Sequence, residues 1–390
     1  MNSEKVVIVG GGVIGCSIAY YLAKEEVDVT LFEKYELVSG ASGANQGGVV
    51  SQNYDSPLID LVLESQKLYG ELKELPFDIE FDKCGSAICI IEEKQWSILE
   101  ERARRLRKTG LIVNLVDGAD LRELEPKLSI DILGASLCYE DFQVNPFNLT
   151  YAFACAAKIL GAKIHTYGEV KNIVVKNGKV ESVITDKGKL KTDYVVNSAG
   201  VWSPVIGGLE NLRLPVKPQR GQLLVTESML PCSFRFIVDA DYLTTAFDPN
   251  SVRRSKDPRI RRGIACTLSQ TQNGNWLIGS SRDLAGFDLR TTLADLKIIV
   301  RRSLRFLPYL RHVNVLRTFA GLRPYSTDGL PILGKVEGIE GLILATGHCG
   351  DGVALAPVTG KIISEIIAKD KAEIEIDKFN YSRFKSAHKM

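Results

Sequence analysis

The sequence predicts an α/β protein of more than one domain, on three observations. An apolar run, a glycine-rich turn and a segment with helical spacing follow one another at the start of the chain, an order typical of a β–α–β unit. The chain has 390 residues, whereas single cores stop growing at roughly 250 to 300 residues, so we expect two domains or one domain with a large insertion. Hydrophobic residues make up 45% and charged residues 25% of the chain, which is typical of a globular protein with a buried core.

The opening unit begins with a strand predicted at 6–9, which runs into the glycine-rich turn at 10–15. Apolar residues then recur every fourth position from Ile14 to Leu22 and predict a helix, and a β-branched run at 27–33 predicts the second strand. The sequence therefore predicts a Rossmann-like unit.

A dinucleotide site has a physical use for each part of this unit. The glycines permit a tight turn, the approach of the backbone to a pyrophosphate and close packing of the helix on the strand, while the helix N-terminus offers N–H groups and a positive dipole end. Glu33 ends the second strand, where a carboxylate would bind the adenosine ribose, and it favours FAD or NAD over NADP. The predicted dinucleotide contacts of this unit are Gly10, Gly12, Val13, Ile14, Gly15, Glu33 and Lys34.

Charge, cysteine usage and hydropathy exclude several classes of function. Lys and Arg number 49 and Asp and Glu 47, a net charge of +2, so the broad positive field of a nucleic-acid binder is missing. The eight cysteines form no CxxC pair and the four histidines are dispersed, so no metal site is predicted and free thiols in a reducing cytoplasm are expected. No run of about 18 uncharged apolar residues occurs, so no membrane-spanning segment is predicted.

Several motifs beyond the opening unit resemble one flavoprotein family. The loop 39–48 contains only small and amide residues, which suits close approach of the backbone to a ligand. Further blocks are DFQVNP at 141–146, YVVNSAGVWS at 194–203, LPVKPQRGQ at 214–222, GNWLIGS at 274–280, GLRP at 321–324, TDGLP at 327–331 and GHCGDG at 347–352. In this order they resemble the FAD-dependent family of glycine oxidase, sarcosine oxidase and D-amino-acid oxidase or dehydrogenase. The last block most resembles β-type subunits of heteromeric proline, hydroxyproline or opine dehydrogenases.

The resemblance implies a Rossmann-like FAD-binding domain and a discontinuous α+β substrate domain built on a large mixed or antiparallel sheet. The FAD-binding domain would comprise 1–80, 141–212 and 317–390, and the substrate domain 81–140 and 213–316. Sequence patterns add strands within 79–91, 223–238 and 341–346, helices at 94–108 and 149–160, and a last helix that begins at Pro357. By resemblance, the last helix would point its N-terminus at the flavin.

The resemblance also implies the remaining cofactor contacts. They are Ser42, Ala44, Asn45, Gln46, Gly47, Val170, Gly200, Gly347, Gly350, Asp351 and Gly352. Gly321 stands where some relatives have a flavin-attaching cysteine, and Asn45 where others have a histidine, so non-covalent FAD is expected.

Arg323 and His348 are the predicted catalytic residues. In glycine-oxidase-like members the arginine of the GLRP segment grips the substrate carboxylate, and a guanidinium fork suits that task; the alternative is a structural arginine paired with Asp328. His348 would hydrogen-bond the flavin or substrate, or cap the adjacent strand. Gln270 and Tyr242 are predicted substrate contacts.

The expected function is oxidation of a small amino or imino acid, such as glycine, sarcosine, proline or hydroxyproline. Hydride would pass from Cα to flavin N5 and leave an imine, in a dehydrogenase rather than an oxidase. The alternatives are a 2-hydroxy acid or polyol-phosphate dehydrogenase and a non-catalytic FAD-containing subunit. The stretch 253–262 carries six positive charges and is either a solvated loop or a docking patch for a partner subunit.

Overall fold

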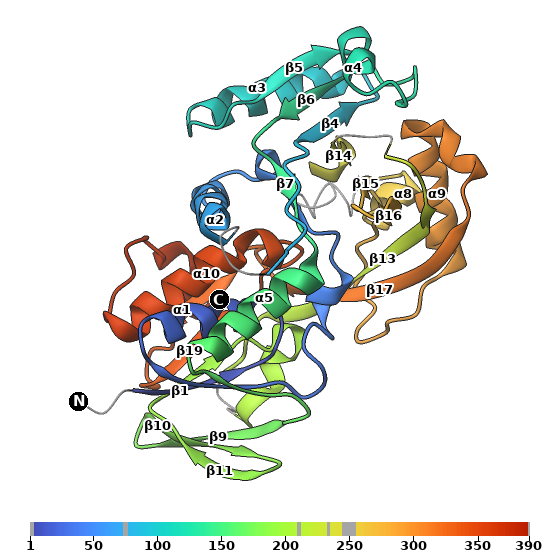
Figure 1. Cartoon of the computed structure of the whole chain (residues 1–390). Coiled ribbons are helices and arrows are strands. Elements are labelled where there is room, and N and C mark those ends of the chain that lie inside the picture. Colours follow the sequence, from blue (N-terminus) through green and yellow to red (C-terminus); the bar gives the residue numbers. More distant parts are fainter. Residues whose placement is uncertain (1–3, 73–76, 209–211, 232–234, 244–254, 389–390) are drawn as a thin grey trace.

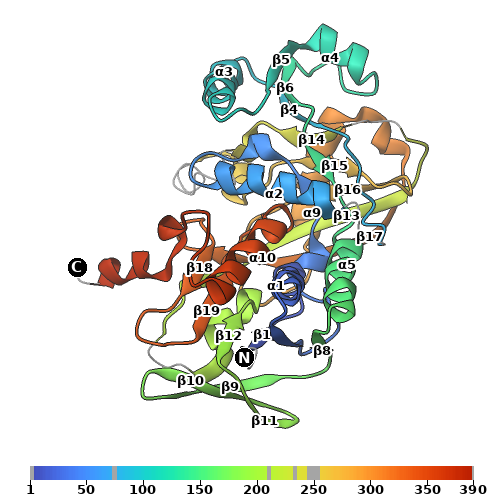
Figure 2. The ribbon, with the colours of Figure 1, turned by 60° about the vertical axis from the view of Figure 1, so that its left-hand side comes forward.

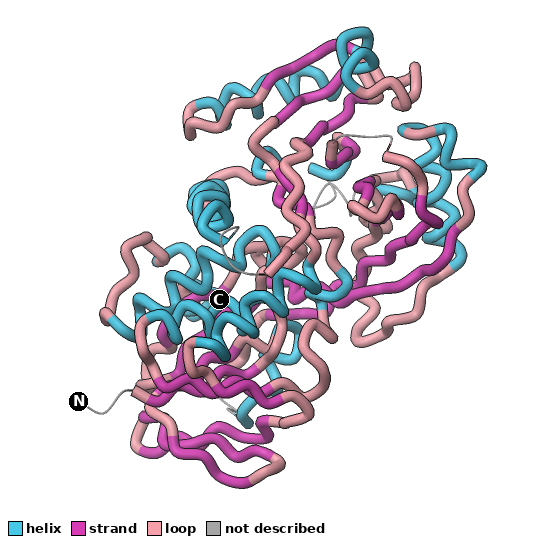
Figure 3. Tube along the Cα trace, viewed as in Figure 1, coloured by secondary structure: helices cyan, strands magenta, loops and turns pink. Residues whose placement is uncertain are grey.

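The computed structural model describes residues 4–72, 77–208, 212–231, 235–243 and 255–388, and it contains two regions, each built on its own large sheet (Figures 1 and 3). The first region has a six-stranded sheet in the order β18-β19-β12-β1-β2-β8. Its strands are β1 Lys5–Val9, β2 Asp28–Phe32, β8 Lys163–His165, β12 Tyr194–Asn197, β18 Ile332–Lys335 and β19 Leu342–Thr346. All neighbours are parallel except the edge pair of β18 and β19. The predicted Rossmann-like fold is confirmed.

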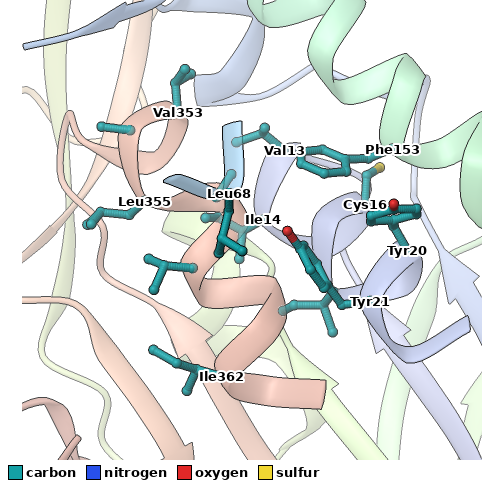
Figure 4. Close-up of a cluster of buried hydrophobic side chains, with 14 of the residues drawn as sticks. Val13, Ile14, Cys16, Tyr20, Tyr21, Leu68, Phe153, Val353, Leu355 and Ile362 are labelled. Atoms are coloured by element: carbon teal, nitrogen blue, oxygen red, sulfur yellow. The ribbon is translucent and has the colours of Figure 1, made fainter. Parts of the chain in front are cut away.

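Both faces of this sheet are covered, because successive side chains of a strand point to opposite faces. Val6 and Ile8 of β1 pack on helices, whereas Val7 and Val9 pack toward a three-stranded antiparallel sheet (Figure 2). The helices are α1 Val13–Lys24, α2 Leu58–Leu72, α5 Pro146–Ile159 and α10 Gly352–Ala368, and the small sheet is β9 Val170–Lys176, β10 Lys179–Thr185 and β11 Gly188–Lys191. Figure 4 shows the core where side chains of these helices meet.

The second region has an eight-stranded sheet in the order β17-β13-β16-β15-β14-β4-β6-β5. Its elements are β4 Ser86–Ile90, α3 Lys94–Arg107, β5 Asn114–Asp117, α4 Gly118–Leu124, β6 Gly134–Cys138, β13 Val216–Ser228, β14 Phe236–Asp239, α8 Pro258–Arg261, β15 Thr267–Gln270, β16 Asn275–Gly279, α9 Leu293–Phe306 and β17 Val315–Ser326. β14 and β4 are parallel and the other pairs antiparallel, so the predicted mixed sheet is confirmed. Trp276 and Phe306 are fully buried where α9 packs on it.

Several short elements lie outside these three sheets. β3 Gly48–Val49 pairs with β7 Phe142–Gln143 in a two-stranded sheet. The 3₁₀ helices are η1 Ala41–Ala44, η2 Ser51–Asn53, η3 Gly200–Gly208, η4 Pro308–His312, η5 Asp377–Phe379 and η6 Tyr381–His388.

The predicted domain bound at residue 317 is wrong by about a strand. It falls inside β17, which pairs with β13 from Val315 to Ser326. The residues 317–326 therefore lie in the sheet of the second region. The strand patterns of the two regions look alike in sequence, so only the pairing partner reveals which sheet a strand joins.

The predicted start of the last helix at Pro357 is also wrong, because α10 begins at Gly352 and contains the proline. A proline inside a helix lacks the N–H that would bind the carbonyl four residues earlier, here that of Val353. The Tyr69 hydroxyl donates to this carbonyl at 2.7 Å. A tertiary hydrogen bond thus replaces the missing helical one, and sequence periodicity holds no sign of it.

Two further predictions concern surface features. The helix predicted at 94–108 is α3, and its Leu99, Ala103 and Leu106 are buried against the core. In the stretch 253–262, residues 253 and 254 lie outside the described residues, whereas Arg259 binds Asp241 at 2.7 Å and Arg262 pairs with Asp295.

Among the described residues, seven cysteines are free thiols and no helix is long and apolar enough to cross a membrane. Cys232 lies outside them.

Candidate functional site

A cavity of about 730 Å³ lies between the two sheets. Its floor is formed where β1, β2 and β12 end, at Val9, Phe32 and Ser198, and its far wall includes residues of β13 and β17. The carboxyl ends of parallel strands are where open α/β sheets bind their ligands. The cavity therefore occupies the place that the opening β–α–β unit predicts for a cofactor.

The turn between β1 and α1 fits a pyrophosphate. Gly10 has φ +110°, and a Cβ there would stand 2.7 Å from the Ser198 carbonyl oxygen. A Cβ on Gly15 would stand 2.0 Å from the Gly10 carbonyl oxygen, so close packing excludes any side chain. Gly12 is the N-cap residue of α1, whose first turn has no acidic residue, and the helix N-terminus opens on the cavity as a site for an anion.

Glu33 closes one end of the cavity. Its carboxylate accepts hydrogen bonds from the Gly11 N–H at 2.7 Å and the Tyr35 N–H at 2.9 Å, which fix the side chain beside the glycine turn. Lys34 and Val170 also line this end, and Lys34 forms an ion pair with Glu169 at 2.8 Å. An acceptor held beside a glycine-rich turn suits an adenosine ribose.

The loop 39–48 crosses the middle of the cavity and binds both regions. Asn45 donates to the Gly350 carbonyl at 3.1 Å, while Gln46 donates to the Leu277 carbonyl at 2.8 Å. The predicted cofactor residues Ser42, Ala44, Asn45, Gln46, Gly200, Gly350, Asp351 and Gly352 line the cavity, whereas Gly15, Gly47 and Gly347 do not. A Cβ on Gly47 would stand 1.9 Å from the Val144 carbonyl oxygen, so this glycine shapes the loop rather than the cavity wall.

Gly321 and Cys349, the two positions where a cysteine could attach a flavin, are both poorly suited to covalent attachment. A Cβ on Gly321 would stand 2.3 Å from the Ala44 Cβ, so a cysteine would not fit there without movement of the loop. Cys349 lines the cavity, but burial raises the pKa of its thiol to about 12. A thiol that stays protonated is a weak nucleophile.

Arg323 enters the cavity from β17. Its guanidinium donates to the Ser281 carbonyl at 2.9 Å and to the Ser280 hydroxyl at 2.8 Å. A Cβ on Gly221 of the neighbouring strand β13 would stand 2.3 Å from Nη1, so that glycine leaves room for the arginine. The guanidinium is thus fixed by two neutral acceptors of the wall.

Among the described residues, no carboxylate lies within 4.0 Å of the Arg323 guanidinium. Asp328, the partner in the structural alternative, instead pairs with Arg383 at 2.6 Å. Burial, together with the nearby charge of Arg282, lowers the pKa of Arg323 to about 10. An enclosed cation without an anionic partner is the arrangement expected of a carboxylate-binding site.

His348 lines the cavity beside Arg323 and is buried. Its Nε2 lies 3.1 Å from the Thr359 hydroxyl. Burial lowers the pKa of the imidazole to about 3, so the ring is neutral at physiological pH. A neutral imidazole of such low basicity is suited to hydrogen bonding and poorly suited to proton abstraction.

The two predicted substrate contacts differ in their outcome. Tyr242 lines the cavity, and the Arg282 guanidinium lies over its ring at 4.3 Å. Gln270 does not line it, which corrects the prediction: its amide donates to the Gly274 carbonyl at 3.0 Å within the β15–β16 turn. Thr267, at the other end of the same strand, lines the cavity instead.

Sequence reasoning missed Tyr54 and Ser280, which also line the cavity. Tyr54 follows η2 and its hydroxyl donates to Asp351 Oδ1 at 2.9 Å. The pairing spans 297 positions of the chain, so no local pattern announces it. Ser280 is the last residue of the GNWLIGS block at 274–280, and the resemblance of that block to the family marks no site residue.

Known proteins are similar to this chain in both sequence and architecture. A family model described as FAD dependent oxidoreductase matches residues 5–366. Hydrogen cyanide synthase subunit HcnC of Pseudomonas protegens is 30% identical, with 98% of this chain and 96% of that protein covered. Glycine oxidase of Geobacillus kaustophilus is 28% identical over 97% of this chain and 96% of its own length.

Solved structures agree with the sequence comparison. L-proline dehydrogenase from P. horikoshii superposes with a TM-score of 0.88 at 26% identity, covering 99% of this chain and 98% of that one. The Geobacillus kaustophilus glycine oxidase structure gives a TM-score of 0.86 at 27% identity, covering 98% and 99%. With its glycine turn, Glu33 and interdomain cavity, the chain belongs to the family of FAD-dependent oxidoreductases.

Proposed function

We propose that this protein oxidises a small amino or imino acid at Cα. The observation that carries the proposal is Arg323, a guanidinium enclosed in the cofactor cavity, held by Ser280 and Ser281 and without a carboxylate partner among the described residues. Such a group would bind a substrate carboxylate in a fixed orientation, which turns the Cα–H bond toward the cofactor.

FAD fits the cavity by its chemistry. Gly10, Gly12 and Ser42 at the glycine turn would hold the pyrophosphate. Glu33 and Val170 would hold the adenosine, and Asn45 with residues 348–352 the flavin end. When bound, FAD supplies the acceptor for the hydride that leaves Cα, so the substrate becomes an imine that water can hydrolyse. The residues of the chain bind and orient the substrate.

The substrate class is inferred from the relatives together with Arg323. Glycine oxidase and L-proline dehydrogenase are named for small amino acids, which favours glycine, sarcosine, proline or hydroxyproline here. We propose a dehydrogenase rather than an oxidase, with a partner subunit as electron acceptor, since HcnC is named as a subunit. The free thiols of the described cysteines favour a reducing compartment, the cytoplasm.

The rival function, oxidation of a 2-hydroxy acid or polyol phosphate, needs a base for the hydroxyl proton. His348 is the residue that would serve, and the pKa of about 3 that burial gives it makes it a weak base. The other rival function is a non-catalytic FAD-containing subunit. Such a subunit would bind no substrate carboxylate, so it does not explain why the Arg323 guanidinium faces the cavity.

We expect an amino or imino acid to bleach the flavin under anaerobic conditions. The purified protein would be mixed with glycine, sarcosine, proline, hydroxyproline, lactate and glycerol phosphate, and the flavin absorbance followed. Bleaching by the hydroxy compounds alone would overturn the proposal. Reoxidation of the bleached protein then separates the acceptors: an artificial dye should act much faster than oxygen, and equal rates would indicate a simple oxidase.

We also expect the flavin to be bound without a covalent link, because Gly321 leaves no room for an attaching side chain. Acid precipitation of the protein should leave yellow FAD in the supernatant. Colour that stays with the precipitate would contradict this expectation.

A further inference from the structure

A carboxylate faces the same cavity as Arg323. Asp351 follows the turn at 347–350 and is the N-cap residue of α10, and both it and Tyr54 line the cavity. The Tyr54 hydroxyl donates to Asp351 Oδ1 at 2.9 Å, which fixes the carboxylate. A Cβ on Gly350, the residue before Asp351, would stand 3.3 Å from Arg323 Nε. The anion and the cation therefore project from adjoining segments of one wall.

The groups around Asp351 differ in how they titrate. Burial raises the pKa of Asp351 to about 6, opposed by the Tyr54 hydrogen bond and by the charges of Arg282 and Arg323. Burial raises the pKa of Tyr54 well above its ordinary value and lowers that of His348 to about 3. Near neutral pH Arg323 stays charged, and Tyr54 and His348 stay neutral. Asp351 is thus the group of this set that changes charge near pH 6.

We propose that Asp351 binds the substrate ammonium group and accepts one of its protons while Arg323 holds the carboxylate. This inference rests on the proposed oxidation of an amino acid. An α-amino acid carries a positive and a negative group on one carbon, and the cavity wall presents the complementary pair. Charge-assisted hydrogen bonds at both ends would hold the Cα–H bond in one orientation.

The proton transfer prepares the substrate for oxidation. A proton leaves the nitrogen for the Asp351 carboxylate, which becomes a neutral acid, and the N–H bonding pair stays on nitrogen as a lone pair. No electrons leave the substrate in this step. An ammonium nitrogen has no lone pair to form a C=N bond, so oxidation at Cα requires the neutral amine. Asp351 would allow the enzyme to use the zwitterion that predominates near neutral pH.

A binding measurement tests the ammonium contact without turnover. The holoenzyme would be titrated with 2-aminoisobutyrate, an amino acid that lacks a Cα–H bond, and with isobutyrate, which lacks the amine. Between pH 5 and pH 8 the affinity for 2-aminoisobutyrate should rise about 10-fold as Asp351 ionises, whereas that for isobutyrate should stay level or fall. The Asp351→Asn variant should lose both trends. Equal trends for the two ligands in the wild type would overturn the inference.

A pH–rate profile tests the proton transfer. At pH 7 the Asp351→Asn variant should show a kcat/KM roughly 100-fold below wild type, because the ammonium form has no acceptor. At alkaline pH a growing share of the free amino acid has an uncharged amino group, so the ratio of wild-type to variant kcat/KM should fall as the pH rises. A loss that is equal at every pH, with normal flavin content, would give Asp351 a structural role and refute the proposal.

Two further variants complete the design. Tyr54→Phe removes the hydrogen bond that lowers the pKa of Asp351, so the acid limb of kcat/KM should move to higher pH while activity remains. Asp60→Asn, an exposed acid in the first turn of α2, should match wild type throughout. If no amino acid bleaches the flavin, the proposed function fails by itself; if wild type is bleached but Asp351→Asn keeps its pH profile, only this inference fails.

Discussion

Arg323→Ala should lower kcat/KM for the amino acid by roughly 30-fold to 1000-fold at normal flavin content. The bidentate pair between a guanidinium and a carboxylate in a partly desolvated site is worth on the order of 2 to 4 kcal/mol, and this is the interaction removed. The guanidinium binds Ser280 and Ser281 on the wall of the second region, away from the glycine turn. The cofactor site should therefore survive the substitution.

Three comparisons make this result specific. Arg323→Lys should recover only part of the loss, because a point charge lacks the planar fork. Arg317→Ala, an exposed position of the same strand β17, should leave the kinetics unchanged. Wild type should prefer the amino acid to the amine without a carboxylate, and Arg323→Ala should lose most of that preference. An equal loss on both substrates, or loss of FAD, would make Arg323 structural.

Glu33→Arg should weaken FAD binding by roughly 100-fold or more and leave the purified protein almost colourless. A charged acceptor contributes about 1.5 to 3 kcal/mol per hydrogen bond, and the arginine removes that acceptor from the ribose. It also removes the carboxylate that binds the N–H groups of Gly11 and Tyr35, so the glycine turn would lose its support. The measurement is the ratio of flavin to protein absorbance, followed by titration of the apoprotein with FAD.

The control for this substitution is Glu36→Arg, which makes the same charge change at an exposed neighbour outside the cavity. Its flavin content should equal that of wild type. Full flavin occupancy in Glu33→Arg would show that the opening β–α–β unit does not hold the adenosine.

The parts of the site that the sequence predicts are those with local signals. The unit from β1 to β2 is contiguous, so its glycines and Glu33 can be placed from spacing alone. Arg323 came from resemblance to a motif. Tyr54 reaches Asp351 across 297 positions of the chain, and such a contact depends on how the two regions fold together.

The sequence also does not predict which end of a strand faces the cavity. Thr267 and Gln270 are the two ends of β15, and an apolar–polar pattern does not say which end meets the cofactor. Gln270 is predicted as a substrate contact within the predicted substrate domain, yet its amide donates to the Gly274 carbonyl in the adjoining turn. The bound at 317 failed for a related reason, since β17 is identified only by its pairing with β13.

The hydrogen bond from Tyr69 to the Val353 carbonyl makes the residue at position 357 depend, in evolution, on the residue at position 69. Loss of that hydroxyl would leave a buried carbonyl unpaired at a cost of about 1 to 3 kcal/mol, unless residue 357 regained a backbone N–H. Substitutions at residue 69 on α2 and residue 357 within α10 are therefore expected to be coupled. A lineage that replaces tyrosine by phenylalanine at the first position would gain by losing proline at the second, and the pair would evolve as one unit.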